Sequence, residues 1–206
     1  MEEKPGGLAL ENVAVGALSA VSLCVAPGEV VCLSGPSGAG KSRLLRAVAD
    51  IEAHTGVIRL AGEDQTSMPA HLWRRRVMMV PADSQWWFDS VGEHFPGVLP
   101  GDELAALGFG PDVDGWSVSR LSTGERQRLA LLRALVLKPN VLLLDEPTSN
   151  LDAERVRTTE RWLLERIRER RIAVLWVAHD PEQIRRVADR HVRLVGAGVE
   201  VVHERD

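Results

Sequence analysis

Gly35-Pro36-Ser37-Gly38-Ala39-Gly40-Lys41-Ser42 is the stretch that decides the fold, because it matches the phosphate-binding pattern GxxxxGK[ST]. An apolar run, residues 30–34, precedes it, and an amphipathic run, residues 41–50, follows it. A strand, a glycine-rich turn and a helix are the context in which backbone N–H groups surround phosphates. We therefore predict that residues 35–42 bind ATP or GTP, with Lys41 on the β- and γ-phosphates and the Ser42 hydroxyl on Mg²⁺.

Short apolar runs recur outside this motif and alternate with longer amphipathic stretches. Runs that are apolar throughout predict strands buried on both faces, as in a parallel sheet covered by helices. The clearest of them are residues 30–34, 77–80, 141–144 and 172–178. Two runs of mixed pattern, residues 9–13 and 57–60, are expected to form a smaller antiparallel sheet near the start.

The composition changes in the middle of the chain. Residues 92–116 are rich in Gly, Pro and Asp and have no clean period, which indicates a compact inserted helical segment. We predict an α/β fold of the P-loop NTPase type, in one domain over residues 1–206. Its catalytic core covers approximately residues 1–81 and 134–206, and an inserted helical subdomain covers residues 82–133.

Two adjacent carboxylates follow the apolar run Val141-Leu142-Leu143-Leu144, namely Asp145 and Glu146. Ligands of parallel sheets bind at the carboxyl ends of the strands, so these acids are expected beside the phosphates. Asp145 is predicted to hold Mg²⁺ and Glu146 to polarise the attacking water. Alone, such a pair is more often a helix cap or a turn, but after a phosphate-binding loop it favours hydrolysis.

Bulk composition narrows the classes of partner. The formal net charge is -4, which offers no global basic field for nucleic acid, so we expect no nucleic-acid partner. Cys24 and Cys32 are too few and too isolated for a disulfide framework or a zinc site, which fits a reducing cytosol. Residues 1–7 are polar and acidic, unlike a secretory signal, and no run is long and apolar enough to span a membrane.

The stretch Leu121-Ser122-Thr123-Gly124-Glu125, followed by Arg126-Gln127-Arg128 and an apolar helix pattern, resembles the LSGGQ signature of ABC ATPases. Thr123 and Glu125 replace the usual Gly and Gln. Residues 149–152 resemble the D-loop of that family, and His179 resembles its switch histidine. Because these motifs occur in the family's order over most of the chain, the sequence resembles the ATP-hydrolysing subunit of an ABC-type membrane transporter.

The resemblance implies how the site works. In the family two cassettes pair head to tail, and each ATP lies between the P-loop of one copy and the signature of the other. The resemblance thus implies ATP and Mg²⁺ as cofactors, a second copy and a membrane-spanning subunit as partners, and a position on the cytoplasmic face of the inner or plasma membrane. It assigns catalysis to Lys41, Glu146 and His179, coupling of the two sites to Asp152, and contact with ATP in trans to Ser122, Thr123, Gly124 and Glu125.

Two family features are altered. The chain contains no Tyr, and residues 14–16, where an aromatic usually stacks on the base, are small or aliphatic. We therefore expect weak discrimination between ATP and GTP. Ala82 follows Val80-Pro81 where a Gln normally contacts Mg²⁺, so Gln85, three residues later, is a candidate for both the metal contact and the coupling role.

Large aromatic residues follow directly, at Trp86, Trp87 and Phe88, in the region that receives the membrane partner in the family. Core packing and exposure as a partner anchor remain open for Trp86 and Trp87. The chain's short length, residues 172–180 and the Leu121 to Arg128 stretch resemble small bacterial cassettes linked to iron export. A soluble ABC ATPase of translation or DNA repair, and a nucleotide-binding regulatory subunit without turnover, stay as alternatives.

Overall fold

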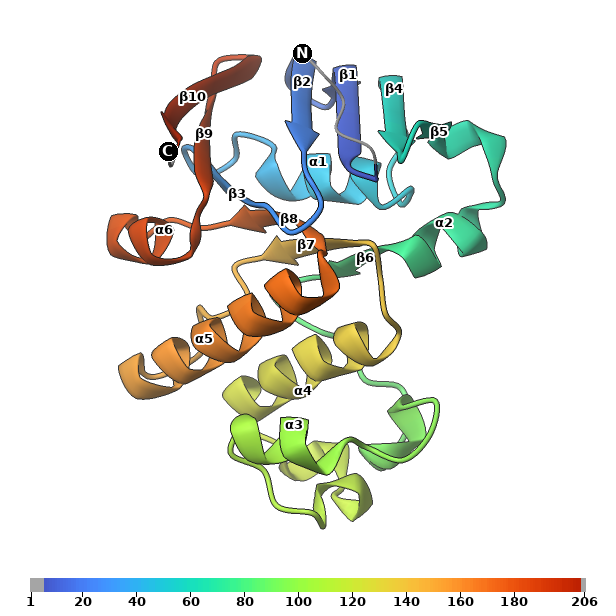
Figure 1. The fold of residues 1–206 in the computed structure, drawn as a ribbon, viewed down its shortest axis with the longest axis vertical. Helices are drawn as coiled ribbons and strands as arrows, with labels where there is room; N and C mark the ends of the chain where they lie inside the picture. Colours follow the sequence, from blue (N-terminus) through green and yellow to red (C-terminus); the bar gives the residue numbers. More distant parts are fainter. Residues whose placement is uncertain (1–5, 205–206) are drawn as a thin grey trace.

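The computed structural model describes residues 6–204, which form two sheets with helix α1 (Lys41–Val48) between them (Figure 1). Helices α4 (Thr123–Val136) and α5 (Ala153–Arg170) cover the other face of the larger sheet. This arrangement confirms the predicted α/β class. Most of the acidic start, residues 1–7, lies outside the described residues.

The larger sheet has the strand order β10-β9-β3-β8-β7-β6. Its parallel part comprises β3 (Val30–Ser34), β6 (Val77–Val80), β7 (Val141–Asp145), β8 (Ala173–Val177) and β9 (Arg190–Val195). Strand β10 (Gly198–Glu204) runs antiparallel to β9 at the edge. Every residue of β3, β7 and β8 is buried, because α4 and α5 cover one face of the sheet and α1 with the smaller sheet covers the other.

The smaller sheet is antiparallel, as expected, and has the order β2-β1-β4-β5. Strands β1 (Leu8–Val15) and β4 (Thr55–Leu60) extend the two runs predicted from sequence. Strands β2 (Leu18–Val25) and β5 (Glu63–Asp64) were not predicted, and neither were β9 and β10.

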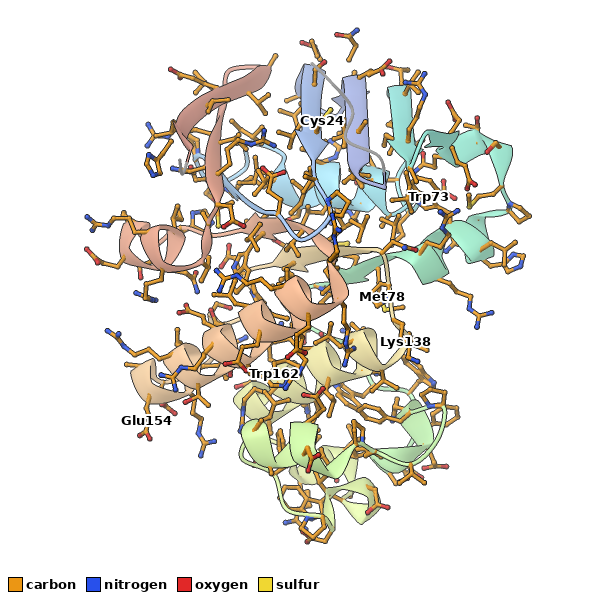
Figure 2. All side chains as sticks on the ribbon, viewed as in Figure 1. Cys24, Trp73, Met78, Lys138, Glu154 and Trp162 are labelled. Carbon is orange, nitrogen blue, oxygen red and sulfur yellow. The ribbon has the colours of Figure 1, made fainter. Side chains whose placement is uncertain are left out.

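One layer of the core lies between the two sheets. It contains Leu44 and Leu45 of α1, packed against Val31 and Leu33 of β3. Trp73 of α2 (Ala70–Arg76) closes this layer, is fully buried, and donates its indole N–H to the Val48 carbonyl at 2.8 Å (Figure 2). This contact fixes the end of the helix that begins at the phosphate-binding loop.

The inserted segment consists of short helical pieces below α4. They are α3 (Gly101–Ala106) and the 3-10 turns Gly92–His94, Val113–Gly115 and Val118–Arg120. Trp162 of α5 donates its indole N–H to the Glu103 carboxylate at 2.6 Å, which ties α3 to the core (Figure 2). Helix α4 runs without interruption across residues 133 and 134. The boundary placed there between the inserted subdomain and the catalytic core therefore stays a prediction.

α6 (Pro181–Val187) follows β8 and leads into the β9-β10 hairpin at the edge of the larger sheet. Within residues 6–204 no helix has the length and apolar character needed to cross a membrane.

Candidate functional site

The loop between β3 and α1 has the geometry that its glycines predict. Gly40 is the N-cap of α1 with φ +97°, and an added Cβ there would lie 3.2 Å from the Leu18 side chain. No side chain caps α1 and no acidic residue occupies its first turn. The N–H groups at this helix end are therefore available to an anion, which is the arrangement that phosphate binding requires.

Lys41 lies inside this loop and its side chain is buried. Its ammonium donates to the Gly35 and Pro36 carbonyls, each at 2.9 Å. Burial lowers the pKa of Lys41, while the charges of Glu146 and Asp145 act in the opposite direction. The ammonium is thus held at the loop with two carboxylates near enough to influence it.

The predicted catalytic carboxylate and histidine meet at neighbouring strand ends. Strands β7 and β8 are parallel, with Asp145 opposite Val177, so Glu146 and His179 emerge at one edge. The distance from His179 Nε2 to Glu146 Oε1 is 2.9 Å. Glu146 has φ +49°, an uncommon conformation for a residue with a Cβ.

Backbone hydrogen bonds hold Glu146 in this conformation. Its N–H donates to the Val177 carbonyl at 3.2 Å, and its carbonyl accepts from the Ser149 N–H at 3.2 Å and hydroxyl at 3.1 Å. Strained residues of this kind persist where surrounding structure determines them, which occurs often at functional sites.

Asp145 and Ser42 are the candidates for Mg²⁺. Asp145 ends β7 and is buried, and Ser42 belongs to the first turn of α1. A carboxylate and a hydroxyl are hard oxygen donors, and Mg²⁺ usually takes one or two such protein ligands together with phosphate oxygens. Among the described residues there is no cluster of three or more His, Cys, Asp or Glu suited to a metal, so a dedicated protein cage is not what this site offers.

The predicted signature forms a second hollow. Ser122 is the N-cap of α4, and its N–H and hydroxyl both donate to the Glu125 carboxylate at 2.8 Å, while the Glu125 N–H donates back to the Ser122 hydroxyl at 3.2 Å. These bonds, led by the one from the Ser122 backbone, lower the pKa of Glu125. The substituted Glu125 is therefore an ionised helix-capping residue.

The signature turn packs on the predicted D-loop. A Cβ added at Gly124 would lie 2.9 Å from the Leu151 side chain and 3.1 Å from the Asn150 carbonyl. Residues 122–125 and 150–152 together line a hollow of about 200 Å³. Asp152 caps α5 by accepting from the Arg155 N–H at 2.9 Å. No residue of the phosphate-binding loop lines this hollow, so residues 35–42 and 122–125 form separate surfaces.

Gln85 is exposed, and its hydrogen bonds are to residues other than Asp145 and Glu146. Its side-chain amide donates to the Asp83 carboxylate at 3.5 Å, and its backbone carbonyl accepts from the Arg133 guanidinium at 3.1 Å. Within the described chain it makes no hydrogen bond to Ser42, Asp145 or Glu146, and its metal contact stays a prediction. A buried residue with no role assigned from sequence, Gln127, instead holds the loop by donating to the Pro81 carbonyl at 3.3 Å.

The aromatic residues after Gln85 divide into a packed and an exposed part. Trp86 packs against the core, whereas Trp87 is 64% exposed and Phe88 is 47% exposed. The Arg133 guanidinium lies 4.5 Å from the ring centre of Trp86 and 4.8 Å from that of Trp87. Of the two predicted anchors, Trp86 and Trp87, only Trp87 is therefore exposed enough to meet a partner.

Sequence reasoning missed the residue that organises this segment, His94. His94 is buried, and its Nε2 accepts from the Trp87 and Phe88 N–H groups at 2.9 and 3.0 Å. Its Nδ1 lies 2.9 Å from the Ser90 carbonyl, to which it donates. The rings of Trp86, Trp87 and Phe88 meet the imidazole edge to face, with centres 4.7, 4.9 and 5.1 Å away.

A second missed residue, Arg43, lies beside Gly16, where the family's base-stacking aromatic is expected. A side chain added at Gly16 would collide with the Arg43 guanidinium, so this group rests on the backbone where the family aromatic is absent. Arg43 is held there by Glu52 at 2.5 Å. A planar guanidinium can stack on an aromatic base, so Arg43 is a candidate substitute for the missing ring.

The fold and the phosphate-binding loop with its acidic strand end define a nucleotide-binding domain of the P-loop class. The sequence model of the ABC transporter family matches residues 18–149, and the chain belongs to this family. In this family, ATP-binding subunits act together with membrane transporter proteins.

Several relatives and solved structures support the assignment. The chain is 38% identical to the "Fe(3+) ions import ATP-binding protein FbpC" of Agrobacterium fabrum, over 91% of this chain and 58% of that protein. It is 32% identical to the "Probable iron export ATP-binding protein FetA" of Escherichia coli, over 94% of this chain and 93% of that protein. A bacterial Atm1-family ABC exporter with ATP bound superposes with TM-score 0.83 at 25% identity, over 97% of this chain and 39% of that one.

Proposed function

We propose that this chain is the ATP-hydrolysing subunit of an ABC transporter, acting on the cytoplasmic face of a membrane with a membrane-spanning partner. The observation that carries the proposal is the Glu146–His179 pair at 2.9 Å, set at the strand ends beside a phosphate-binding loop that holds Lys41. This combination supplies a base, an orienting group and a cation for a phosphoryl group.

Each residue then has one task in the reaction. The loop N–H groups and Lys41 hold the phosphates, and Ser42 and Asp145 would hold Mg²⁺, which when bound neutralises charge on the phosphate oxygens. Glu146 accepts the proton of the attacking water. His179, whose Nε2 lies 2.9 Å from Glu146 Oε1, would orient the Glu146 carboxylate and, as in the family, contact the γ-phosphate.

We infer that the active form is a head-to-tail pair of copies. The phosphate-binding loop and residues 122–125 form separate surfaces, so one copy cannot close around the nucleotide with both of them. A second copy related by a two-fold axis would supply the missing surface to each site. Glu125 can face phosphate because its charge is engaged by Ser122 and lies near Arg128 and Arg155.

The partner surface is assigned to the loop after β6. A groove of about 460 Å³ lies between this strand and α4, lined by Met79, Trp87, His94 and Leu137 among others. Its apolar and aromatic walls fit an apolar helix end of the membrane subunit. Hydrolysis or release of the nucleotide would shift the loop that contains Pro81, which Gln127 ties to α4, and would thereby change this groove.

The transported substrate is proposed from similarity alone. One relative that is 32% identical to this chain is named for iron export, and residues 172–180 together with the Leu121 to Arg128 stretch resemble export cassettes of this kind. We propose iron export on these two grounds. Reconstitution with the membrane subunit and measurement of iron movement tests the direction.

Steady-state turnover separates this function from a non-hydrolysing regulatory role. We expect Mg²⁺-dependent release of phosphate from ATP, and we expect Glu146→Gln to lose at least about a hundredfold in kcat because the base is removed. ATP affinity should persist in that variant. Glu165→Gln, a matched change at an exposed position on α5, should retain full turnover. Wild-type turnover in Glu146→Gln would contradict the assignment.

A further inference from the structure

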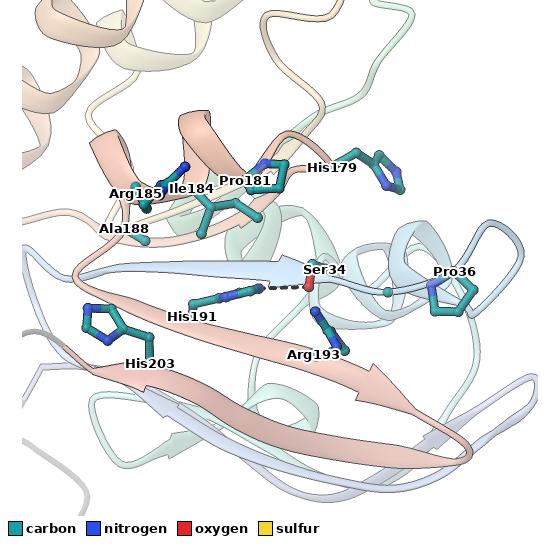
Figure 3. A pocket seen from close by; sticks show the side chains of 11 residues that line it. Ser34, Pro36, His179, Pro181, Ile184, Arg185, Ala188, His191, Arg193 and His203 are labelled. Atoms are coloured by element: carbon teal, nitrogen blue, oxygen red, sulfur yellow. Dashed lines mark hydrogen bonds between the residues drawn. The ribbon is translucent and has the colours of Figure 1, made fainter.

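A hollow most of whose lining residues have no role in the proposed ATPase function lies beside the phosphate-binding loop (Figure 3). It has a volume of about 870 Å³ and is bounded by α6, the β9-β10 hairpin and the end of β3. Pro181, Ile184 and Ala188 give it an apolar wall. The opposite wall carries His191, Arg193 and His203, which come from the hairpin (Figure 3).

Strand alternation explains the basic wall. Val192 and Leu194 of β9 are buried in the core, so His191 and Arg193 point to the other face. His203 of β10 lies directly opposite His191 in the strand register. The Arg193 guanidinium is the fixed positive charge of this wall, and protonation of either histidine beside it would add repulsion that a bound anion offsets.

Among the residues that the structure describes, no carboxylate lines the hollow beside this wall. None of its lining residues is Asp or Glu. Glu200 is the register partner of Arg193, yet the two form no ion pair within 4 Å. The side chains of Arg193 and His203 form no ion pair or hydrogen bond with any residue from 6 to 203, whereas Arg185 on α6 is paired with Glu182.

His191 joins the wall to the root of the phosphate-binding loop. Its Nε2 lies 2.7 Å from the hydroxyl of Ser34, the last residue of β3 (Figure 3). Burial, together with the charges of Arg193 and His203, lowers the pKa of His191. A bound anion would oppose these charges and make protonation of the ring easier.

We propose that this hollow is a binding site for a small organic anion. A phosphate or carboxylate group would face Arg193 and His203, and an apolar body would lie against Ile184 and Ala188. Arginine suits such a group because its planar fork can bind two oxygens at once. Arginine is not a metal ligand, and no metal-type cluster exists among the described residues, so a metal ion fits this wall poorly.

The site is distinct from the triphosphate site but adjacent to it. Lys41, Asp145 and Glu146 do not line the hollow, whereas Gly35, Pro36 and His179 do. A ligand here would thus contact the loop and the histidine that serve the nucleotide. Its binding free energy is then coupled to that of ATP, with the same factor in both directions.

Calorimetric titration with phenyl phosphate tests the proposal, with the triphosphate site saturated by a non-hydrolysable ATP analogue and Mg²⁺. We expect binding that persists under saturation and weakens at least about tenfold in Arg193→Gln, because the fork is lost. Arg75→Gln, a matched change on the exposed side of α2, should leave it unchanged. Inorganic phosphate should bind less tightly than phenyl phosphate because it cannot use the apolar wall.

Three results would overturn the proposal. One is loss of phenyl phosphate binding when the analogue is bound, together with no effect of Arg193→Gln, which would assign the anion to the phosphate-binding loop. Another is equal weakening in Arg193→Gln and Arg75→Gln, which would indicate general charge attraction. The third is no saturation up to about 10 mM, an affinity weaker than about 3 kcal/mol.

His203→Gln and backbone amide NMR shifts provide the test if Arg193→Gln does not fold. Shifts confined to β9, β10 and α6 support the site, and shifts confined to residues 35–42 contradict it. Turnover by Glu146 is measured separately, so failure of this proposal is distinguishable from failure of the ATPase assignment.

Discussion

Replacing Trp87 by Ala tests the partner surface, and the expected loss of free energy can be calculated from the exposed fraction of this side chain. Trp87 exposes 64% of its surface, so of the roughly 250 Å² that a tryptophan can bury, about 160 Å² is available to a partner and about 90 Å² is already buried. At about 25 cal/mol per Å², the buried part is worth at most about 2 kcal/mol of folding free energy and the exposed part at most about 4 kcal/mol of docking.

Docking recovers only part of that area term, because ordering and desolvation costs oppose it. We therefore expect Trp87→Ala to weaken binding of the membrane subunit by at least about 2 kcal/mol, a roughly 30-fold loss. ATP affinity should not change. Trp86→Ala is the comparison, since Trp86 packs against the core and its indole N–H is fully buried. It should instead cost about 3 to 5 kcal/mol of folding free energy.

Thermal melts and pull-downs with the membrane-spanning subunit separate the two effects. For a domain of this size each kcal/mol shifts Tm by about 2–4 °C. Trp86→Ala should therefore melt about 6–20 °C lower, and Trp87→Ala, which loses at most about 2 kcal/mol of folding free energy, no more than about 4–8 °C lower. The reasoning is refuted if Trp87→Ala melts like Trp86→Ala, or if both variants melt normally and retain the partner.

Further predictions concern the base, the signature and pH. ATP and GTP should bind within about tenfold, or ~1.4 kcal/mol, and Arg43→Ala should weaken both alike; calorimetry showing a hundredfold preference for ATP would mean a missed recognition element. Ser122→Ala should lose about 1 kcal/mol of stability in urea unfolding because the α4 cap is removed, and no loss would contradict the capping role. Because the pKa of Glu125 is lowered in the folded chain, its contribution is present above the ordinary value of 4.5 and lost as pH falls through the folded value. Glu125→Gln should therefore flatten the fall in stability below pH 4.5, and an unchanged profile would count against this.

Short-range patterns predicted the phosphate-binding loop and the central strands. The loop is one contiguous run whose glycines and Lys41 act locally, and strands β3, β7 and β8 are apolar on both faces, so each could be recognised without knowing its neighbours. The acidic pair was predictable because parallel strands bring their carboxyl ends to one edge. The positive φ of Glu146 was not, because it depends on the hydrogen bond that Glu146 donates to Val177 and on those it accepts from Ser149.

Features that depend on tertiary contacts could not be predicted from the sequence. Strands β2 and β9 are buried only in part, so their apolar pattern is broken and neither was predicted. His94 lies in a segment without periodicity, and its role arises from hydrogen bonds to backbone groups of Trp87 and Phe88. The basic wall of the anion site needs His191 and His203 from two strands in register. A local sequence pattern cannot predict that two residues on different strands lie opposite each other.

The molecular mass of Glu146→Gln with saturating Mg-ATP tests the central claim most directly. This variant keeps the phosphate contacts but lacks the base, so ATP should hold two copies together without being consumed. Light scattering should give about 22.6 kDa without nucleotide and twice that value with Mg-ATP. Lys41→Ala in the same background should stay at the monomer mass because it loses a phosphate contact. A mass that stays at 22.6 kDa in Glu146→Gln at saturating ATP would contradict the account.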